Sequence, residues 1–378
     1  MQRLRVAFVI SARALTADGR GQAPRLPSRW HHDADVVASA IYLPSSGRLA
    51  SLPALARHVA SADLVHVVSA FPTPLFDDTL ATFSVARALG CPVIQSFEVP
   101  DGAAAATRVS VLRHAFGAAL TVVPSSDIVD ALDRSAVPAT MIPEPIDADE
   151  FPFREREPLR PRLLSVGGFE PLDNVAATIR AFAIVQQRWP DATLTLIGRG
   201  PQETTLRALV AELGLRHVLF VASGAHVDLP RAYAEHDIFV QGANVDLTAT
   251  SVLRSFASGL PVVSTAAGAV PAVLTHGVHG LLAPLAEYET IGHHVRRLLD
   301  DPAYARALAR NARALSEAYY WPQIREQWLN AYDRARGDAG RRAAAGRRRA
   351  LFDVVRPDTH VQPAARRNDR PAAARHSS

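Results

Sequence analysis

The stretch from Phe256 to Thr265 (FASGLPVVST) constrains the fold of this chain more than any other. Gly259 can take the left-handed backbone conformation that closes a helix, and Pro261 prevents the helix from resuming. Val262 and Val263 then suit a strand that is covered on both faces. A helix, a glycine stop and a buried strand in this order are typical of a parallel sheet wrapped by helices.

The same alternation of apolar runs and amphipathic stretches continues along most of the chain. In the first part, strands are predicted at residues 5–10, 36–43, 64–69, 92–96, 121–123 and 140–142, with helices at 52–60, 77–89, 109–116 and 126–135. In the second part, strands are predicted at residues 163–166, 193–197, 218–221, 238–241, 262–264 and 280–283, with a helix at 174–188. This alternation predicts an α/β protein with two doubly wound, Rossmann-like domains.

The boundaries of these domains follow from changes in composition. Residues 143–161 carry prolines and charges without periodicity and are interpreted as a linker, which separates a domain at 1–142 from one at 162–335. The last helix of the second domain is expected to run from Trp321 to about Arg334. Residues 336–378 are rich in Ala, Arg and Pro with few apolar residues, so we expect a disordered C-terminal tail.

The composition of the chain indicates where in the cell the protein is expected and which partners it is not expected to bind. None of its apolar runs reaches 18 residues, which predicts no membrane-spanning helix, and the single cysteine, Cys91, excludes a disulfide framework. We therefore expect a cytoplasmic protein with, at most, peripheral membrane contact. The net charge of +4 is modest, and the tail holds a dense cluster of arginines. The charge of the chain therefore does not indicate nucleic-acid binding. All 41 basic residues are arginine, so arginine must do any cationic work on phosphate.

Five short blocks carry a resemblance to a known family. They are VGGFEP at 166–171, LIGRGP at 196–201, YAEHDIFV at 233–240, FASGLPVVST at 256–265 and GVHGLL at 277–282. In this order they resemble the C-terminal half of the retaining glycosyltransferases of the GT-B fold, the group 1 or family 4 set. The resemblance covers residues 160–335 well and residues 1–150 weakly. It implies two domains facing a cleft, a nucleoside-diphosphate sugar donor, a saccharide or lipid-linked acceptor, and neither metal nor other cofactor.

The start of the helix that ends at Gly259 is a candidate phosphate site. Free amides at a helix N-terminus can hold phosphate. Thr248, Thr250 and Ser251 add hydroxyl donors there, and Thr248 also suits the N-cap position.

Two positions near this helix depart from the family pattern of two glutamates separated by seven residues. The corresponding residues are Asp246, which the resemblance implies contacts the donor sugar, and Arg254. Arg254 inverts the charge where a ribose-binding carboxylate is implied, because a guanidinium only donates hydrogen bonds.

The loop after the first strand of the second domain also departs from the pattern. Gly167 is followed by Gly168, and Gly168 and Asp173 stand where the family has a phosphate-binding Arg and Lys. We hypothesise that Arg199 or Arg254 supplies the missing positive charge. In the first domain, Glu98 is the best ionisable candidate for a side chain near the reacting carbon.

Two functions from different classes remain open. The first is an active retaining glycosyltransferase, and the alternative is a catalytically degenerate GT-B protein that acts as a binding or scaffold partner. The pairs Asp33–Asp35 and Asp147–Asp149 are interpreted as turn charges rather than metal ligands. A dinucleotide-dependent oxidoreductase is set aside, because Ser11 and the residues after it lack the glycine pattern that such an enzyme needs.

Overall fold

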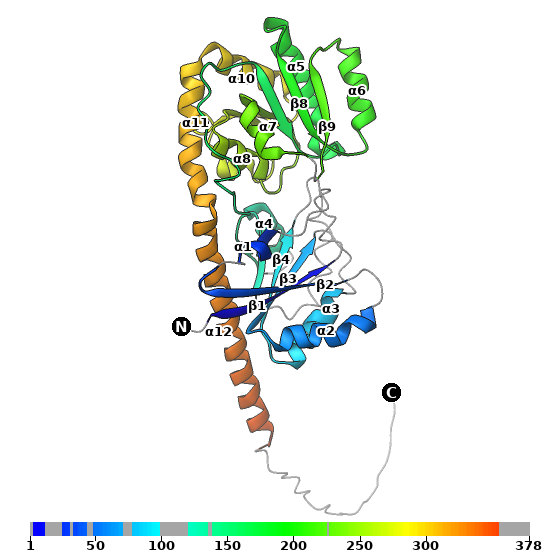
Figure 1. Ribbon diagram of the computed structural model, residues 1–378, viewed down its shortest axis with the longest axis vertical. Coiled ribbons are helices and arrows are strands. Elements are labelled where there is room, and N and C mark those ends of the chain that lie inside the picture. Colours follow the sequence, from blue (N-terminus) through cyan, green and yellow to red (C-terminus); the bar gives the residue numbers. More distant parts are fainter. Residues whose placement is uncertain are drawn as a thin grey trace, which may run out of the picture. The chain divides into compact units, whose positions relative to one another are not determined.

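The computed structural model describes residues 3–11, 25–30, 33–43, 48–70, 78–98, 120–134, 138–224 and 227–354. Two sheets of six strands each dominate the described chain, and all paired strands are parallel (Figure 1). The predicted α/β class with two doubly wound halves is therefore confirmed. Residues from Gly340 onward form a separate unit.

The first sheet has the strand order β2-β1-β3-β4-β5-β6. Its strands are β1 Leu4–Ser11, β2 Val36–Leu43, β3 Leu64–Ala70, β4 Val93–Glu98, β5 Leu120–Val123 and β6 Thr140–Met141. The helices described in this part are α1 Arg25–Arg29, α2 Arg48–Ala60, α3 Asp78–Ala88 and α4 Ser126–Asp133. The six predicted strands are confirmed within two residues, whereas the predicted helix at 109–116 lies outside the described residues. We call this sheet and its helices the first lobe.

The second sheet has the strand order β12-β11-β10-β7-β8-β9. Its strands are β7 Arg162–Val166, β8 Thr193–Gly198, β9 Val218–Ala222, β10 Ile238–Gln241, β11 Val262–Thr265 and β12 Leu281–Ala283. Its helices are α5 Val175–Arg188, α6 Glu203–Glu212, α7 Leu229–Glu235, α8 Thr250–Ser258, α9 Val270–Val273, α10 Tyr288–Asp300 and α11 Pro302–Ser316, with single 3-10 turns at Pro171–Asp173 and Glu317–Tyr319. We call this part the second lobe.

Local sequence explains these elements well. The face predicted for α5 is buried in the core of the second lobe at all four positions, Val175, Ile179, Phe182 and Val185. Gly259 closes α8 with a φ of 76°, the left-handed conformation that its sequence position predicted.

The last helix, α12 (Trp321–Val354), completes the core of the first lobe. Ile324, Trp328 and Tyr332 on its first turns are buried in the same cluster as the strands of the first sheet. Tyr332 also meets His66 of β3, whose Nδ1 lies 3.0 Å from its hydroxyl, and the other ring nitrogen lies 2.8 Å from Ser96 Oγ. Complete burial lowers the pKa of His66 to about 3, so this histidine is a neutral part of the core.

The end of α12 corrects one expectation. The helix was expected to end near Arg334, with a disordered tail from 336, but the described helix continues to Val354. Few apolar residues mean that little surface can be buried, but they do not oppose helix formation itself, and Ala and Arg are strong helix formers. The rest of the expected disordered tail, 355–378, lies outside the described residues.

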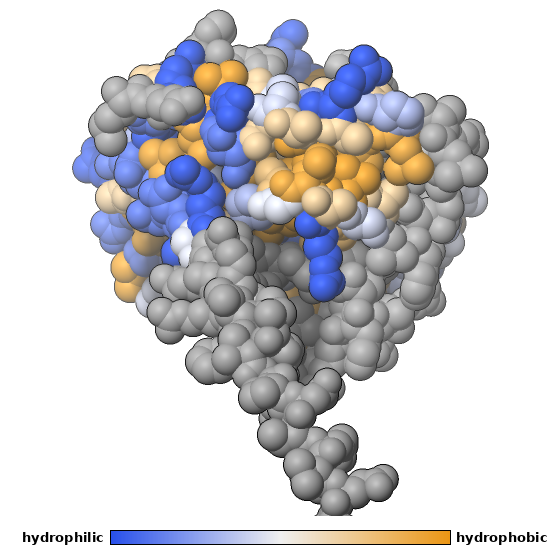
Figure 2. Space-filling model, turned by 90° about the horizontal axis from the view of Figure 1, so that it is seen from below, coloured by the Kyte–Doolittle hydropathy of each residue, from blue (hydrophilic) through white to orange (hydrophobic). Residues whose placement is uncertain are grey.

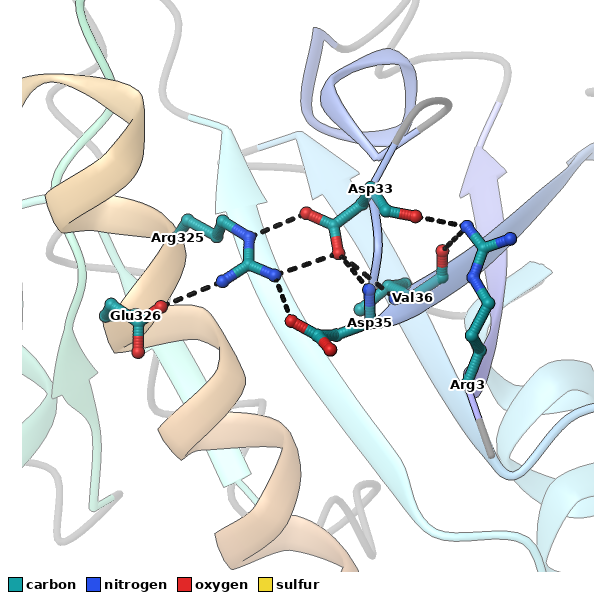
Figure 3. A network of polar contacts seen from close by, with 6 residues as sticks. All are labelled: Arg3, Asp33, Asp35, Val36, Arg325 and Glu326. Carbon is teal, nitrogen blue, oxygen red and sulfur yellow. Dashed lines mark hydrogen bonds and ion pairs between the residues drawn. The ribbon is translucent and has the colours of Figure 1, made fainter. Parts of the chain in front are cut away.

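A polar network also fastens α12 to the start of β2 (Figure 3). Arg325 Nε lies 2.6 Å from Asp33 Oδ2, and Arg325 Nη2 lies 2.6 Å from Asp35 Oδ2. Asp33 Oδ1 accepts the amides of Asp35 and Val36. Burial on its own would raise the pKa of Asp33, but Arg325 and these amides outweigh it and hold the pKa below its ordinary value. The pair therefore anchors the start of a strand. The interpretation as turn charges suits the exposed Asp35, whereas Asp33 is almost completely buried against Arg325.

One face of the described surface carries a large apolar area. Seen from below, this area lies beside hydrophilic side chains, among which smaller apolar groups also occur (Figure 2). Val37 and Tyr42 are exposed on β2, an edge strand of the first sheet. In the described chain, no helix combines the length and the apolar character that crossing a membrane requires.

Candidate functional site

A pocket opens at the carboxyl ends of β7, β8 and β10, where the first turn of α8 meets the loop after β7. Its empty volume, with the open mouth included, is about 640 Å³. Doubly wound sheets bind their ligands at this edge, because the loops that follow parallel strands converge there. The lining includes Ser165, Val166, Phe169, Val175, Thr178, Ile197, Gln241, Gly242, Ala243, Val245 and Leu247.

Most of the residues singled out from the sequence also line this pocket. They are Gly167, Gly168, Asp173, Asp246, Thr248, Thr250 and Ser251. The structure thus gathers the loop after β7 and the start of α8 into one site. Arg199 and Arg254 are not among the described residues that line it.

The loop after β8 packs against the loop after β7 so closely that glycine is required. A Cβ on Gly198 would lie 2.2 Å from the carbonyl oxygen of Gly167, and one on Gly200 would lie 2.5 Å from the carbonyl carbon of Phe169. Arg199 stands between these glycines, and its carbonyl oxygen accepts the amide of Phe169 at 2.8 Å. Its side chain is exposed. Arg199 therefore holds the two loops together through its main chain.

Asp173 occupies the space beside Gly168. A Cβ on Gly168 would lie only 2.4 Å from Asp173 Oδ2, and this oxygen accepts the amide of Glu170 at 2.8 Å. Glu170 and Asp173 cap the single 3-10 turn between them reciprocally. The two departures in this loop are therefore coupled, because the missing side chain at Gly168 makes room for the Asp173 carboxylate.

Asp246 organises the start of α8. Its Oδ1 accepts the amides of Thr248 (3.2 Å) and Ala249 (2.8 Å), and its Oδ2 accepts Nε2 of Gln241 at 2.8 Å. Ala249, with a φ of 51°, is the N-cap residue of α8 and makes no side-chain capping bond. The prediction that Thr248 caps the helix is therefore wrong, because the Asp246 carboxylate takes up the two amides that precede the helix.

Arg254 turns toward the segment that joins the lobes. Its guanidinium carbon lies 5.6 Å from the centre of the Phe151 ring, a cation–π arrangement. Arg254 lies one helical turn beyond Thr250 and Ser251, farther from the start of α8, and it is not among the described residues that line the pocket. The hypothesis that Arg254 supplies positive charge to the pocket stays a prediction.

The electrostatics of the pocket follow from these placements. Among the described lining residues, Asp173 and Asp246 are carboxylates and none is a histidine or an arginine. The amides of Thr250, Ser251 and Val252 open α8 and have no acceptor within the helix, since the first helical bond joins the amide of Leu253 to Ala249. An anion in this pocket would therefore be held by main-chain dipoles rather than by side-chain cations.

One carboxylate beside the pocket was missed by the sequence analysis. Glu144 Oε2 lies 3.2 Å from the hydroxyl oxygen of Thr250, the first residue of α8. The sequence placed Glu144 in the linker, between Pro143 and Pro145, and nothing local to that segment indicates that it reaches a helix more than a hundred residues away.

The remaining candidates do not add to this pocket. Glu98 ends β4, and its side chain lies outside the described part of the structure. Asp147 Oδ1 accepts the amides of Asp149 and Glu150, the behaviour expected of a turn charge. The described residues contain no group of three or more His, Cys, Asp or Glu side chains that could hold a metal ion.

The fold and the position of the pocket together identify the fold class of the chain. Two parallel Rossmann-like sheets in one chain, with a pocket at the strand ends of the second, are the GT-B fold. Solved structures with this fold include HepE of Anabaena in complex with UDP, with a TM-score of 0.70, 14% identity, and coverage of 87% of this chain and 100% of that one. Another is sucrose-phosphate synthase of Thermosynechococcus elongatus, with a TM-score of 0.67, 19% identity, and coverage of 88% and 98%.

The second lobe also resembles a known family. Residues 147–315, which include most of the second lobe, match the family described as "Glycosyl transferases group 1". The sulfoquinovosyl transferase of Arabidopsis thaliana is 27% identical over 56% of this chain and 44% of that protein. The MMP alpha-(1->4)-mannosyltransferase of Mycolicibacterium hassiacum is 25% identical over 77% and 75%. Several other curated relatives are matched over about half of their length.

Proposed function

We propose that this protein transfers a sugar from a nucleoside-diphosphate sugar to a saccharide or lipid-linked acceptor, with retention of the anomeric configuration. The observation that carries the proposal is the pocket at the carboxyl edge of the second sheet, formed by the glycine loop after β7 and the open first turn of α8. This pocket lies in the part of the chain that matches the group 1 glycosyl transferases. Related folds have been solved with UDP and with UDP-glucose, which supports a nucleotide-sugar donor.

The residues of the pocket have distinct roles in this proposal. The amides of Thr250 and Ser251, together with the loop at Gly167 and Gly168, bind the diphosphate leaving group through main-chain dipoles rather than through a bound metal. Asp246 sets the geometry of the first turn of α8 and faces the donor sugar. Glu98, at the end of β4, is the candidate carboxylate that the first lobe contributes to the reacting carbon.

Calorimetric titration with UDP- and GDP-sugars tests donor binding, and proton NMR of the product tests the anomeric outcome. We expect heat of binding with at least one donor and a product glycoside with the same anomeric configuration as the donor sugar. An inverted product would exclude the retaining mechanism. The absence of binding by every donor, with folded protein, would exclude the transferase.

The second candidate function is a GT-B protein that has lost donor chemistry and binds a partner. The observation that favours it is the charge of the pocket, whose described lining carries two carboxylates and no side-chain cation. Restoring the family pattern distinguishes the two. The variant carries Gly168→Arg and Arg254→Glu, together with Asp173→Lys because the Asp173 carboxylate fills the space beside Gly168. Activity that appears only in this variant would identify the natural chain as degenerate.

A further inference from the structure

The segment that joins the lobes runs along helix α8 from end to end. We call residues 144–156 the strap. At the first turn of α8, Glu144 Oε2 lies 3.2 Å from the hydroxyl oxygen of Thr250. In the middle, Phe151 lies under the guanidinium of Arg254. At the last turn, the amide of Arg154 donates to the carbonyl oxygen of Ser258 at 3.1 Å.

Three buried residues fix the strap in this position. Ile146 and Phe151 are buried apolar residues of the core cluster that contains α8. Arg156 is only 2% exposed, and its guanidinium donates to the carbonyl oxygens of Ser258 and Tyr233, the latter at 2.8 Å. Glu144 stands two residues before the buried Ile146. Its position at the start of α8 is therefore set by the fold and not by a freely moving chain.

The contact of Glu144 decides how the nearby hydroxyls are oriented. The hydroxyl oxygens of Thr250 and Thr248 lie 3.0 Å apart, and the Thr250 hydroxyl also meets the Glu144 carboxylate. A hydroxyl has a single proton and an ionised carboxylate only accepts. The single proton of the Thr250 hydroxyl is therefore shared between the Glu144 carboxylate and the Thr248 oxygen, and the charged acceptor is the stronger one. The Thr250 hydroxyl then does not donate to a ligand in the pocket.

The same carboxylate places a negative charge at the positive end of α8. Anions are favoured at a helix N-terminus, whether they belong to a side chain or to a ligand. None of the described residues that line the pocket is a cation, so no side chain there offsets the competition between Glu144 and a bound phosphate. Glu144 thus takes the proton of the Thr250 hydroxyl and part of the electrostatic potential that a diphosphate would use.

We propose that Glu144 is an internal competitor of the donor's diphosphate, held at the first turn of α8 by the strap and displaced when the donor binds. This inference rests on the proposed function for the identity of the donor, but not for the anion site itself. Because Glu144 belongs to the strap, its displacement links the occupancy of the pocket to the segment that joins the two lobes. Glu144 is a specificity-determining residue in this account, and it weakens the binding of free nucleotide.

The test compares Glu144→Gln with the natural chain in calorimetric titrations with UDP and with inorganic pyrophosphate. Glutamine keeps the size of the side chain and removes its charge. We expect both probes to bind about five-fold more tightly at low salt, and the gain to shrink as ionic strength rises from about 20 mM to about 500 mM. Glu144→Asp keeps the charge and should bind both probes with the natural affinity.

The matched control is Glu212→Gln. Glu212 is exposed at the C-terminal end of α6, which returns to the amino edge of the sheet, away from the pocket. The substitution makes the same change in net charge within the same lobe, and we expect it to leave both affinities unchanged. An equal gain in affinity in this control would show that the effect of Glu144→Gln comes from the change in net charge alone, and it would overturn the inference.

The outcomes separate this inference from the proposed function. Tighter pyrophosphate binding by Glu144→Gln without UDP binding by either protein would support the inference and contradict a nucleotide donor. UDP binding that is unchanged or weaker in folded Glu144→Gln would overturn the inference and leave the proposed function intact. The absence of pyrophosphate binding by both proteins would overturn the inference, since the competition requires an anion site.

Discussion

The two ends of helix α8 are both complemented by charge, but with opposite consequences. At the C-terminal end, the buried guanidinium of Arg156 donates to carbonyl oxygens of α8 and α7. At the N-terminal end, the carboxylate of Asp246 accepts the amides of the two residues before the helix, and the carboxylate of Glu144 meets the hydroxyl of its first residue. Both arrangements match the helix dipole and stabilise the helix. The C-terminal end is closed and structural, whereas the N-terminal end faces a pocket, where the same stabilisation competes with an anionic ligand.

The largest effect is expected at the closed end. Arg156→Met should lower the free energy of unfolding by about 3 kcal/mol, because several buried carbonyl oxygens lose a charged donor. Burial lowers the pKa of Arg156 to about 9, so the side chain is still charged at neutral pH in the natural chain. Urea denaturation measures the change. Arg160→Met, an exposed arginine of the same linker, should change the free energy of unfolding by less than about 0.5 kcal/mol. Equal effects of the two substitutions would show that Arg156 is not a structural cap.

At the open end, Asp246→Ala should lower the free energy of unfolding by about 2 kcal/mol. It removes the acceptor of the amides of Thr248 and Ala249 and of the Gln241 amide group. Asp246→Asn keeps one carbonyl acceptor and should lower the free energy of unfolding by about half as much as Asp246→Ala. UDP titration should show weaker binding by the alanine variant, because the first turn of α8 loses its geometry. Full stability together with lost binding would instead place Asp246 in direct contact with the ligand.

The loop facing α8 offers a double-mutant cycle. Gly168→Ala should cost about 1.5 kcal/mol of unfolding free energy, since its Cβ would lie 2.4 Å from Asp173 Oδ2. In the background of Asp173→Ala the same substitution should cost almost nothing. The expected coupling is about 1 kcal/mol, measured from four denaturation curves. Strict additivity of the two substitutions would show that Gly168 and Asp173 are independent.

The smallest effect is expected in the middle of the helix. Arg254→Met should lower the free energy of unfolding by about 0.5 kcal/mol, because the half-buried guanidinium loses its cation–π contact with Phe151. The affinity for UDP, measured by calorimetry, should remain unchanged because Arg254 is not among the described residues that line the pocket. A large loss of UDP affinity would place Arg254 at the ligand and remove the distinction between the two ends of α8.

Much of the fold was predictable because local rules decide it. Short runs of buried valine and leucine gave the twelve strands, and the period of α5 gave its buried face. Gly259 stopped α8 in the conformation expected of it. The end of α12 was predicted wrongly, since composition predicts whether a segment can build a core and not whether its backbone is helical.

The site was predictable only in part. The loop after β7 and the start of α8 were identified from the sequence, and the carboxyl edge of a parallel sheet brings such loops together. The directions of the arginines were not predictable. Arg199 is exposed and Arg254 meets the strap, because the packing of Phe151 and of the glycine loops decides where each side chain can go.

By itself, the sequence determined the order of strands and helices, the left-handed stop at Gly259 and the loops that form the pocket, because each depends on neighbours in the chain. Only the tertiary structure decided that Glu144 and Arg156 meet opposite ends of α8. Both contacts join residues about a hundred positions apart, and no local preference encodes such a distance. The charge at the mouth of the pocket is therefore a property of the folded chain, set by where the strap lies.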